Sequence, residues 1–340
     1  MISLKPFFQA SYLETQSNFL FWNSGQIIGS MKFSILIFFT SFLFFSCATE
    51  MQIPSISDSN RIEKDLYRIT KTDKSRNYQN IETLNFVAGY IYDELSLSCD
   101  TVYFQKYIVN GTAYKNVIGI IGKDKKERVV VGAHYDVAGN QEGADDNASG
   151  VAGLLELSRL LSKENLDYMV ELVAYTLEEP PFFRTEHMGS HIHAKSLIES
   201  SENVKGMICL EMIGYFSEAK NSQDYPIGLL KLFYGNKGDF ITVVQKFGNG
   251  SFGRKVNRKM KSHKLIRTKS FRAPVKLPGI DFSDHLNYWK FGYRAVMITN
   301  TAFYRNKHYH EPTDKMETLD LEKMGLVIDQ VFLTLKEIDK

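Results

Sequence analysis

The sequence predicts an α/β fold in which a mostly parallel sheet is flanked by helices. Short runs rich in Val, Ile, Tyr and Phe alternate along the chain with longer segments whose apolar residues recur at helical spacing. The segments "IETLNFVAGYIYDEL" and "SGVAGLLELSRLLS" have a helical period, whereas "RVVVGAHYD" and "MVELVAYTLEE" have the composition of buried strands. Alternation of this kind places ligands at the carboxyl ends of the strands.

The expected elements follow this alternation along the chain, without internal repeats. Strands are predicted over residues 101–109, 116–122, 128–136, 169–179, 204–215, 229–235 and 294–301. Helices are predicted over residues 81–95 and 149–162, near 188–200, after Asp239, and over 283–292 and 319–338.

The composition is that of an ordinary globular protein and excludes several classes of function. With 340 residues, 44% of them apolar and 13% aromatic, the chain has enough material for a large core. Its 41 basic and 39 acidic residues give a formal net charge of +2, so no global field favours nucleic acid as a partner. Its 3 cysteines supply neither a disulfide framework nor a cysteine zinc site. Any metal must therefore be held by oxygen and imidazole ligands.

The N-terminal region predicts export. The apolar run "FSILIFFTSFLFFSC" follows Met31 and ends at Cys47; it has the length of a signal-peptide core and is too short for a membrane span. We expect residues 1–30 to be a non-structural upstream extension and residues 31–47 to be the signal peptide. Because "FFSC" is similar to a relaxed bacterial lipobox, we expect Cys47 to be lipidated and the protein to be membrane-anchored. Ordinary cleavage after Ala48 or an uncleaved anchor are the alternatives.

Beyond the signal peptide, residues 48–75 are polar and are expected to form a tether, and residues 76–340 to form a single catalytic domain. Within that domain, residues 254–272 hold nine Lys or Arg and no acid. A solvated loop and edge strand is the preferred interpretation, with a polyanion contact as the alternative. The preceding "GNGSFG", residues 248–253, fits a dinucleotide-binding spacing, but we expect a flexible turn there.

Acidic residues and histidines gather at the predicted strand ends. An acid at one strand end is usually just solvated, but several strand ends that deliver carboxylates and imidazoles to one edge of a sheet repel one another unless protons or cations are present. Oxygen and nitrogen ligands without thiolates suit zinc, and the set is large enough for two ions. The residues concerned are His134, Asp136, Asp145, Asp146, Glu178, Glu179, Glu211 and His310.

Five ordered motifs carry a resemblance to a known family. "GAHYD", "GADDNASG", "AYTLEEP", "LEMIGY" and "YHEPTD" together resemble the co-catalytic dizinc aminopeptidases of peptidase clan MH, relatives of glutamate carboxypeptidase and of the glutaminyl cyclases. The resemblance spans roughly residues 80–340. It implies a three-layer sandwich with a mixed, mostly parallel central sheet, and it implies Zn2+ as cofactor. The zinc ligands that it implies are His134, Asp146, Glu179, Glu211 and His310, with Asp146 as the bridging carboxylate.

The same resemblance implies roles for residues around the ligands. Glu178 matches the general base and acid, and Asp136 matches a residue that orients the imidazole of His134. Tyr309 matches a position where some relatives stabilise the oxyanion, and Asp284 and His285 resemble residues close to the metals. Glu211 stands where most relatives have Asp, which leaves one zinc or two open.

Two further expectations concern the loops of the site. Relatives often make the peptide bond after the bridging residue cis, so we expect a cis bond between Asp146 and Asn147, with Asp145 only supporting the turn. The insertion-like "PPFFRTEHMGS", residues 180–190, leaves the metal edge directly and is expected to line the substrate cleft.

These observations predict an exported zinc metallopeptidase that removes residues from peptide or protein N-termini, with zinc activating the attacking water and Glu178 accepting its proton. A glutaminyl cyclase with one zinc and a catalytically inactive binding lipoprotein on the same fold are the alternatives. A serine hydrolase is disfavoured because no G-x-S-x-G is present, and "HEPTD" lacks the second His of H-E-x-x-H.

Overall fold

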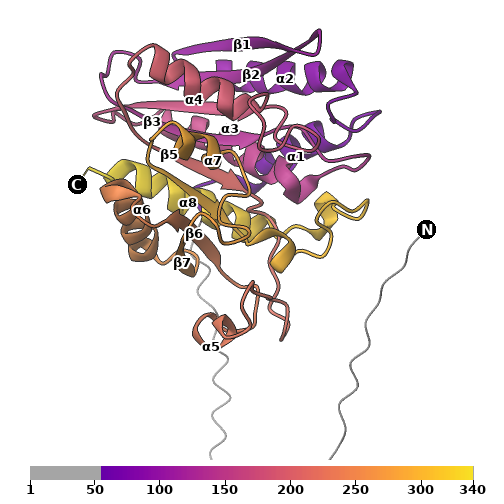
Figure 1. The fold of residues 1–340 in the computed structure, drawn as a ribbon, viewed down its shortest axis with the longest axis vertical. Helices are drawn as coiled ribbons and strands as arrows, with labels where there is room; N and C mark the ends of the chain where they lie inside the picture. Colours follow the sequence, from indigo (N-terminus) through magenta and orange to yellow (C-terminus); the bar gives the residue numbers. More distant parts are fainter. Residues whose placement is uncertain (1–54, 340) are drawn as a thin grey trace, which may run out of the picture. The chain divides into compact units, whose positions relative to one another are not determined.

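One mixed sheet organises the computed structural model, which describes residues 55–339 (Figure 1). Its strand order is β1-β2-β4-β3-β5-β8-β6-β7. The strands are β1 (Thr101–Val109), β2 (Thr112–Ile121), β3 (Arg128–His134), β4 (Met169–Tyr175), β5 (Val204–Glu211), β6 (Ile241–Lys246), β7 (Thr268–Ala273) and β8 (Ala295–Thr299).

The four central strands run parallel. β3 pairs in parallel with β4 and with β5, and β5 pairs in parallel with β8, whereas β2 and β6 join this group antiparallel. The central strands are buried along almost their whole length, as expected when both faces of a parallel sheet are covered. Parallel pairing puts the carboxyl ends of β3, β4, β5 and β8 at one edge, which is where the acidic residues and histidines lie.

Helices cover both faces of the sheet and give three layers. One large hydrophobic cluster joins the sheet to α1, α2, α3, α6 and α8, and a second cluster on the other face joins it to α4 and α7. The predicted α/β class with a mixed, mostly parallel sheet is confirmed. The helices are α1 (Ser59–Thr70), α2 (Ile81–Ser96), α3 (Gly150–Leu161), α4 (Gly189–Glu199), α5 (Leu230–Tyr234), α6 (Gly250–His263), α7 (His285–Lys290) and α8 (Leu321–Glu337).

The prediction of a tether over residues 48–75 was wrong for residues 59–70. Those residues form α1, which Asp58 caps by accepting hydrogen bonds from the first-turn backbone, and Ile62, Leu66 and Ile69 are fully buried. Their spacing places the three apolar side chains on one helical face, which the surrounding charged residues mask in the sequence.

Three predictions between residues 229 and 263 were also wrong. Residues 230–234 form the short helix α5 and pair with no strand. Residues 241–246 form β6 and not a helix, because the β-branched run pairs with β7 and β8. Residues 250–253, which were expected to lie in a flexible turn, begin α6, and that helix extends to His263, so residues 254–263 are helical and not a loop.

The predicted upstream extension, signal peptide and lipidation site at Cys47 lie outside the described residues. Over residues 55–339, none of the helices combines the length and the apolar character needed to cross a bilayer. Cys99 and Cys209, the cysteines of this described part, are free thiols.

Candidate metal centre

Four strand ends deliver the predicted ligands to one place. His134 ends β3 and Glu211 ends β5, while Glu179 follows β4 and His310 follows β8. His134, Asp146 and Glu179 each offer a ligand atom, and these atoms lie within 4.8 Å of one another. The sheet topology therefore brings the predicted site together from positions far apart in the chain.

The carboxylate of Asp146 lies between the two histidines. Its Oδ1 is 3.3 Å from Nε2 of His134, and its Oδ2 is 3.2 Å from Nε2 of His310. The peptide bond between Asp146 and Asn147 is cis, as predicted. Each oxygen of this one carboxylate thus faces a different imidazole, which is the arrangement that a bridging ligand requires.

A second carboxylate completes each half of the site. Oε2 of Glu211 is 3.5 Å from Nε2 of His134, and Oε2 of Glu179 is 3.2 Å from Nε2 of His310. Two groups of three ligands result, one with Glu211 and the other with Glu179, and they share Asp146. The structure brings together all five residues that the sequence predicted as metal ligands.

The turn that carries Asp146 is held by two neighbouring carboxylates. Asp145 accepts hydrogen bonds from the backbone N–H groups of Gly214 and Tyr215 and from the side-chain amides of Asn300 and Asn306, so it joins the loops after β5 and β8. This role is wider than the support of one turn that the sequence predicted.

Asp314 holds the same turn from the other side. Its two carboxylate oxygens accept the backbone N–H groups of Asp145 and Asp146, both at 3.0 Å. Sequence reasoning missed this residue, although it ends the "YHEPTD" motif. The position of Asp146 therefore depends on a side chain 168 residues further along the chain.

Arg76 is a second residue that sequence reasoning missed. Its buried guanidinium donates to the carbonyl oxygens of Tyr135, Glu142 and Gly143, which lie on both sides of the loop between β3 and the Asp146 turn. Burial lowers the pKa of Arg76 to about 10, and nearby carboxylates, Asp314 first, oppose that shift. Nothing in the local sequence around Arg76 signals this contact.

Asp136 positions the two glutamates that follow β4. Its carboxylate oxygens accept the backbone N–H groups of Glu178 and Glu179, both at 3.2 Å. Its Oδ1 is also 3.6 Å from Nδ1 of His134, but the backbone oxygen of Asp136 lies closer to that nitrogen, at 3.2 Å. Asp136 therefore holds the Glu178 and Glu179 backbone through its carboxylate, and it contacts the imidazole of His134 most closely through its backbone oxygen; its orienting role stays a prediction.

The predicted catalytic residues border the ligands. Glu178 is buried, and its Oε2 lies 3.9 Å from Nε2 of His134. Burial and the neighbouring carboxylates raise its pKa well above the usual range. The ring of Tyr309 stacks on the ring of His310, with centroids 3.8 Å apart, so the phenol lies beside a ligand.

Glu211, the residue that departs from the common family pattern, is held firmly. Its Oε2 accepts a 2.6 Å hydrogen bond from the hydroxyl of Ser283, and the side-chain amide of Asn147 lies 3.4 Å from the same oxygen. These contacts fix the longer side chain so that it still reaches the imidazole of His134.

Asp284 and His285 differ in their surroundings. Asp284 is fully buried, neither of its carboxylate oxygens has a hydrogen-bond partner among the described residues, and burial raises its pKa to about 7. His285 points elsewhere: its Nε2 lies 2.8 Å from the carbonyl oxygen of Ile280, and its ring packs edge-on against Trp289. Burial lowers the pKa of His285 to about 4, so it stays neutral and structural.

The site carries more negative charge than its histidines can balance, and this is the observation that fits a metal. Burial lowers the pKa of His134, but the nearby carboxylates of Glu178 and Glu211 raise it well above the usual range. Burial also lowers the pKa of His310, but hydrogen bonds with Asp146 and Glu179 raise it to about 10. Oδ1 of Asp146, Oε1 of Glu179 and Nε2 of His310 are buried without a hydrogen-bond partner. Such atoms, all oxygen or imidazole nitrogen, fit zinc.

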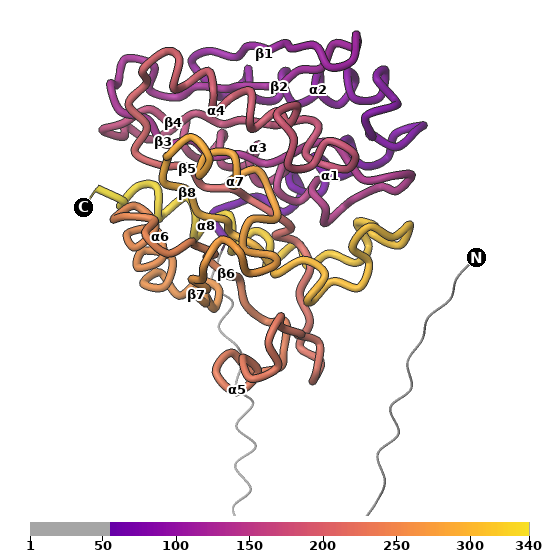
Figure 2. The backbone as a smooth tube through the Cα atoms, in the orientation of Figure 1, coloured from indigo at the N-terminus to yellow at the C-terminus, as the bar shows by residue number. Residues whose placement is uncertain are grey.

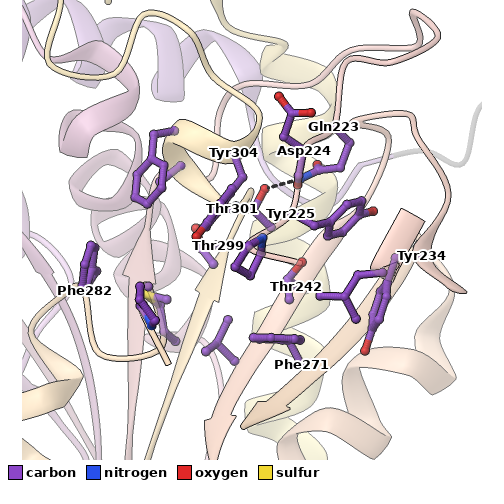
Figure 3. A pocket seen from close by; sticks show the side chains of 18 of the residues that line it. Gln223, Asp224, Tyr225, Tyr234, Thr242, Phe271, Phe282, Thr299, Thr301 and Tyr304 are labelled. Carbon is purple, nitrogen blue, oxygen red and sulfur yellow. Dashed lines mark hydrogen bonds between the residues drawn. The ribbon is translucent and has the colours of Figure 1, made fainter. Parts of the chain in front are cut away.

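An apolar pocket adjoins the expected metal ligands at Glu211. Figure 3 shows the aromatic side chains of Tyr225, Tyr234 and Phe271 around it, and the side-chain amide of Gln223 bonded to Thr301 at its rim. Residues 180–190, which were predicted to line the substrate cleft, do not border this pocket. Their Phe182 instead turns into the core against Tyr78.

The histidines without a matching motif lie outside the ligand set. His193 was expected on the surface or at a helix cap but is buried, with Nδ1 2.6 Å from the hydroxyl of Tyr288 and Nε2 3.5 Å from Glu171. The other members of this group, His187, His191, His263 and His308, likewise contact none of the five ligands in the described part of the chain.

Asp314→Asn should weaken zinc binding, because one of the two backbone N–H groups would then face an amide donor. Outer contacts of this kind typically contribute 10- to 100-fold to metal affinity. We expect a loss of that size in a chelator-competition titration. Asp320→Asn is the matched control, since Asp320 caps α8 through the Lys323 N–H group and touches no ligand. Unchanged zinc affinity in the Asp314 variant would show that the turn carrying Asp146 keeps its position without the Asp314 carboxylate.

Comparison with known proteins finds a matching family model and similar sequences. A model of peptidase family M28 matches residues 116–335. The uncharacterized protein YfbL of Escherichia coli (strain K12) is 43% identical over 290 residues, covering 83% of this chain and 89% of its own length. Leucine aminopeptidase 1 of Fusarium vanettenii is 26% identical, covering 66% of this chain and 55% of its own length. The chain thus spans little more than half of that fungal relative.

Solved structures share the fold at low sequence identity. LapA aminopeptidase of Legionella pneumophila has a TM-score of 0.64 and 20% identity, covering 82% of this chain and 71% of its own. Glutaminyl cyclase of Porphyromonas gingivalis has a TM-score of 0.64 and 16% identity, covering 84% and 99%. A Zn-dependent exopeptidase of Parabacteroides distasonis has a TM-score of 0.63 and 18% identity, also covering 84% and 99%. Peptidases and cyclases share this fold, so only the site can separate them.

Proposed function

This chain belongs to peptidase family M28, whose members are aminopeptidase-like zinc hydrolases, and from that premise we propose that it is an exported aminopeptidase using two zinc ions. The observation that carries the proposal is the position of Asp146, whose two oxygens face two separate ligand groups. A carboxylate shared in this way suits a pair of metal ions.

The residues divide the work of hydrolysis. When bound, zinc supplies an activated water and polarises the scissile carbonyl. Glu178 accepts a proton from that water and passes it to the leaving amine, which its position beside His134 allows. Asp136 keeps Glu178 in place through its backbone, and Tyr309, whose ring stacks on that of His310, is proposed to donate to the developing oxyanion.

The direct test is release of a chromophore from an amino-acid p-nitroanilide by the purified protein. We expect release that a zinc chelator abolishes and that added Zn2+ restores. A broad panel of such substrates without any turnover would favour a binding protein that has kept the fold.

A glutaminyl cyclase is the second candidate, because cyclases are among the structural neighbours and because Glu211 departs from the common peptidase residue. One zinc would need only the group with Glu179. The other group is nevertheless intact. The imidazole of His134 faces Oδ1 of Asp146 on one side and Oε2 of Glu211 on the other. Incubation with a Gln-initiated peptide separates the two: pyroglutamate identifies the cyclase, and free glutamine the peptidase.

The apolar pocket supports a preference for large apolar N-terminal residues. Val244 lines the pocket, so Val244→Phe should take up space that a large substrate side chain would occupy. We expect kcat/KM for a leucine substrate to fall by about 10- to 100-fold, in line with about 1–3 kcal/mol for lost apolar contact. The kcat/KM for an alanine substrate should fall far less. Measuring both substrates on one preparation controls for misfolding. Equal losses on the two substrates would contradict the assignment of the pocket to the substrate side chain.

Lipidation at Cys47 remains part of the proposal and rests on the sequence alone. Labelled palmitate should be incorporated into the protein expressed in a bacterial host and should be absent from a Cys47→Ala variant. Equal labelling of both would disprove lipidation at that cysteine, without any bearing on the hydrolytic site.

A further inference from the structure

The basic residues of this chain are concentrated in one segment. From Phe240 to Ile280 the sequence has eleven Lys or Arg and no Asp or Glu, although the whole chain is close to neutral. We call residues 240–280 the basic segment. It contains β6, α6 and the edge strand β7, which pack together at one end of the sheet (Figure 1).

One face of α6 carries positive charge without compensation. Arg254, Arg258 and Lys261 follow one another at helical spacing and are exposed, while Val256 and Met260 on the other side are buried. Lys255 and Lys259 pair with the acids near the C-terminus, but no ion pair to the three exposed residues occurs among residues 55–339.

Next to the basic segment stands a group of exposed apolar side chains. We call Ile227, Leu229, Leu232 and Phe233, in α5 and the turn before it, the apolar tip. Leu232 is 80% exposed and Phe233 is 77% exposed. Isolated exposed apolar residues are common, but four within seven residues form a patch that indicates an interaction.

Direct contacts join the apolar tip to the basic segment. The hydroxyl of Tyr234 in α5 donates to the carbonyl oxygen of Ser270 in β7, and the ammonium group of Lys269 donates to the carbonyl oxygen of Tyr234. Both views of the backbone show α5 projecting from the sheet below β6 and β7 (Figures 1 and 2).

We propose that the apolar tip and the basic segment form a docking surface for an anionic lipid bilayer. Exposed Leu and Phe next to Lys and Arg is the combination by which proteins bind the bilayer interface: apolar side chains enter the headgroup region and cations approach anionic lipid. A projecting tip suits a bilayer better than a protein partner, which needs a broad complementary face. The proposal goes beyond the enzymatic function and does not depend on it.

Docking would have a direct consequence for the pocket. Leu230 and Tyr234 of the same helix line the pocket beside Glu211. The pocket rim would therefore lie at the bilayer surface, within reach of peptides that are held there.

The test uses the full chain reconstituted into vesicles, where a local probe reports contact whether or not the N-terminus is anchored. Leu232→Trp places the probe on the apolar tip. Leu97→Trp is the matched control, because Leu97 is also 80% exposed but follows α2 at the far side of the sheet. Quenching by brominated phosphatidylglycerol and brominated phosphatidylcholine is compared after subtraction of the wild-type signal.

We expect quenching at position 232 with the anionic lipid, little at position 97, and less at either position with phosphatidylcholine. Arg258→Glu with Lys261→Glu should weaken docking by at least about fivefold for each charge lost, whereas Lys123→Glu with Lys126→Glu, in the turn between β2 and β3, should not. Equal quenching at both positions, no quenching at either, or full quenching in the α6 variant overturns the proposal. A shift of the probe caused by an acidic peptide alone would assign the surface to a protein partner instead.

Discussion

Glu178→Gln should abolish turnover while zinc stays bound. Glutamine has the size and shape of glutamate but cannot accept a proton, and general acid–base catalysis contributes roughly 10²- to 10⁴-fold to rate. Because Glu178 is buried near His134 but belongs to neither ligand group, the substitution should leave both groups intact. We expect kcat to fall by at least about 10³-fold, with an unchanged zinc content measured by mass spectrometry.

A glutamate on the same loop provides the control. Glu186 is exposed, so Glu186→Gln should keep full activity. Near-normal turnover by the Glu178 variant would refute its role as the base. Loss of zinc from that variant would instead make Glu178 a ligand.

Asp146→Asn should remove most of the metal as well as the activity. An amide offers one neutral oxygen where the two ligand groups now share two anionic oxygens. We expect the zinc content to fall from the proposed two ions per chain to fewer than one. We expect kcat/KM to fall by at least about 10³-fold, because activation of the water and polarisation of the scissile carbonyl are lost together.

His134→Ala is the informative companion to this variant. His134 belongs only to the group with Glu211, so one zinc should remain in the group with Glu179 and His310. If either the Asp146 variant or the His134 variant retained two zinc ions, that result would contradict the sharing of Asp146 by two ligand groups. Full activity of the His134 variant with one zinc, together with pyroglutamate as product, would favour the cyclase.

The five expected ligands were assigned from the resemblance of the motifs to a known family, and for His134, Glu179 and Glu211 a local signal in the sequence agrees with that assignment. An acid or a histidine directly after an apolar strand is visible in one sequence, and parallel pairing then places such residues together. For the same reason the central strands were predicted well. The failures lie where the signal is weak: charged residues obscure the apolar face of α1, and α5 pairs with no strand although its Leu232 and Phe233 are apolar and exposed.

The residues that hold the ligands in place could not be predicted in this way. Asp314 acts through backbone N–H groups and Arg76 through backbone carbonyl groups, so neither depends on the identity of a partner side chain. Their contacts exist only once distant segments are folded together. The hydrogen bond from Ser283 to Glu211 is likewise a product of tertiary structure.

The guanidinium of Arg76 also bears on the question of which part of the chain makes a working enzyme. The match to the family model begins at residue 116, after α1, α2 and β1. Yet Arg76 lies before that boundary and holds carbonyl groups at 135, 142 and 143 inside it. Cutting the protein at the family boundary would leave these carbonyl groups without their buried donor. We therefore expect the smallest active fragment to extend beyond residues 116–335 and to include Arg76.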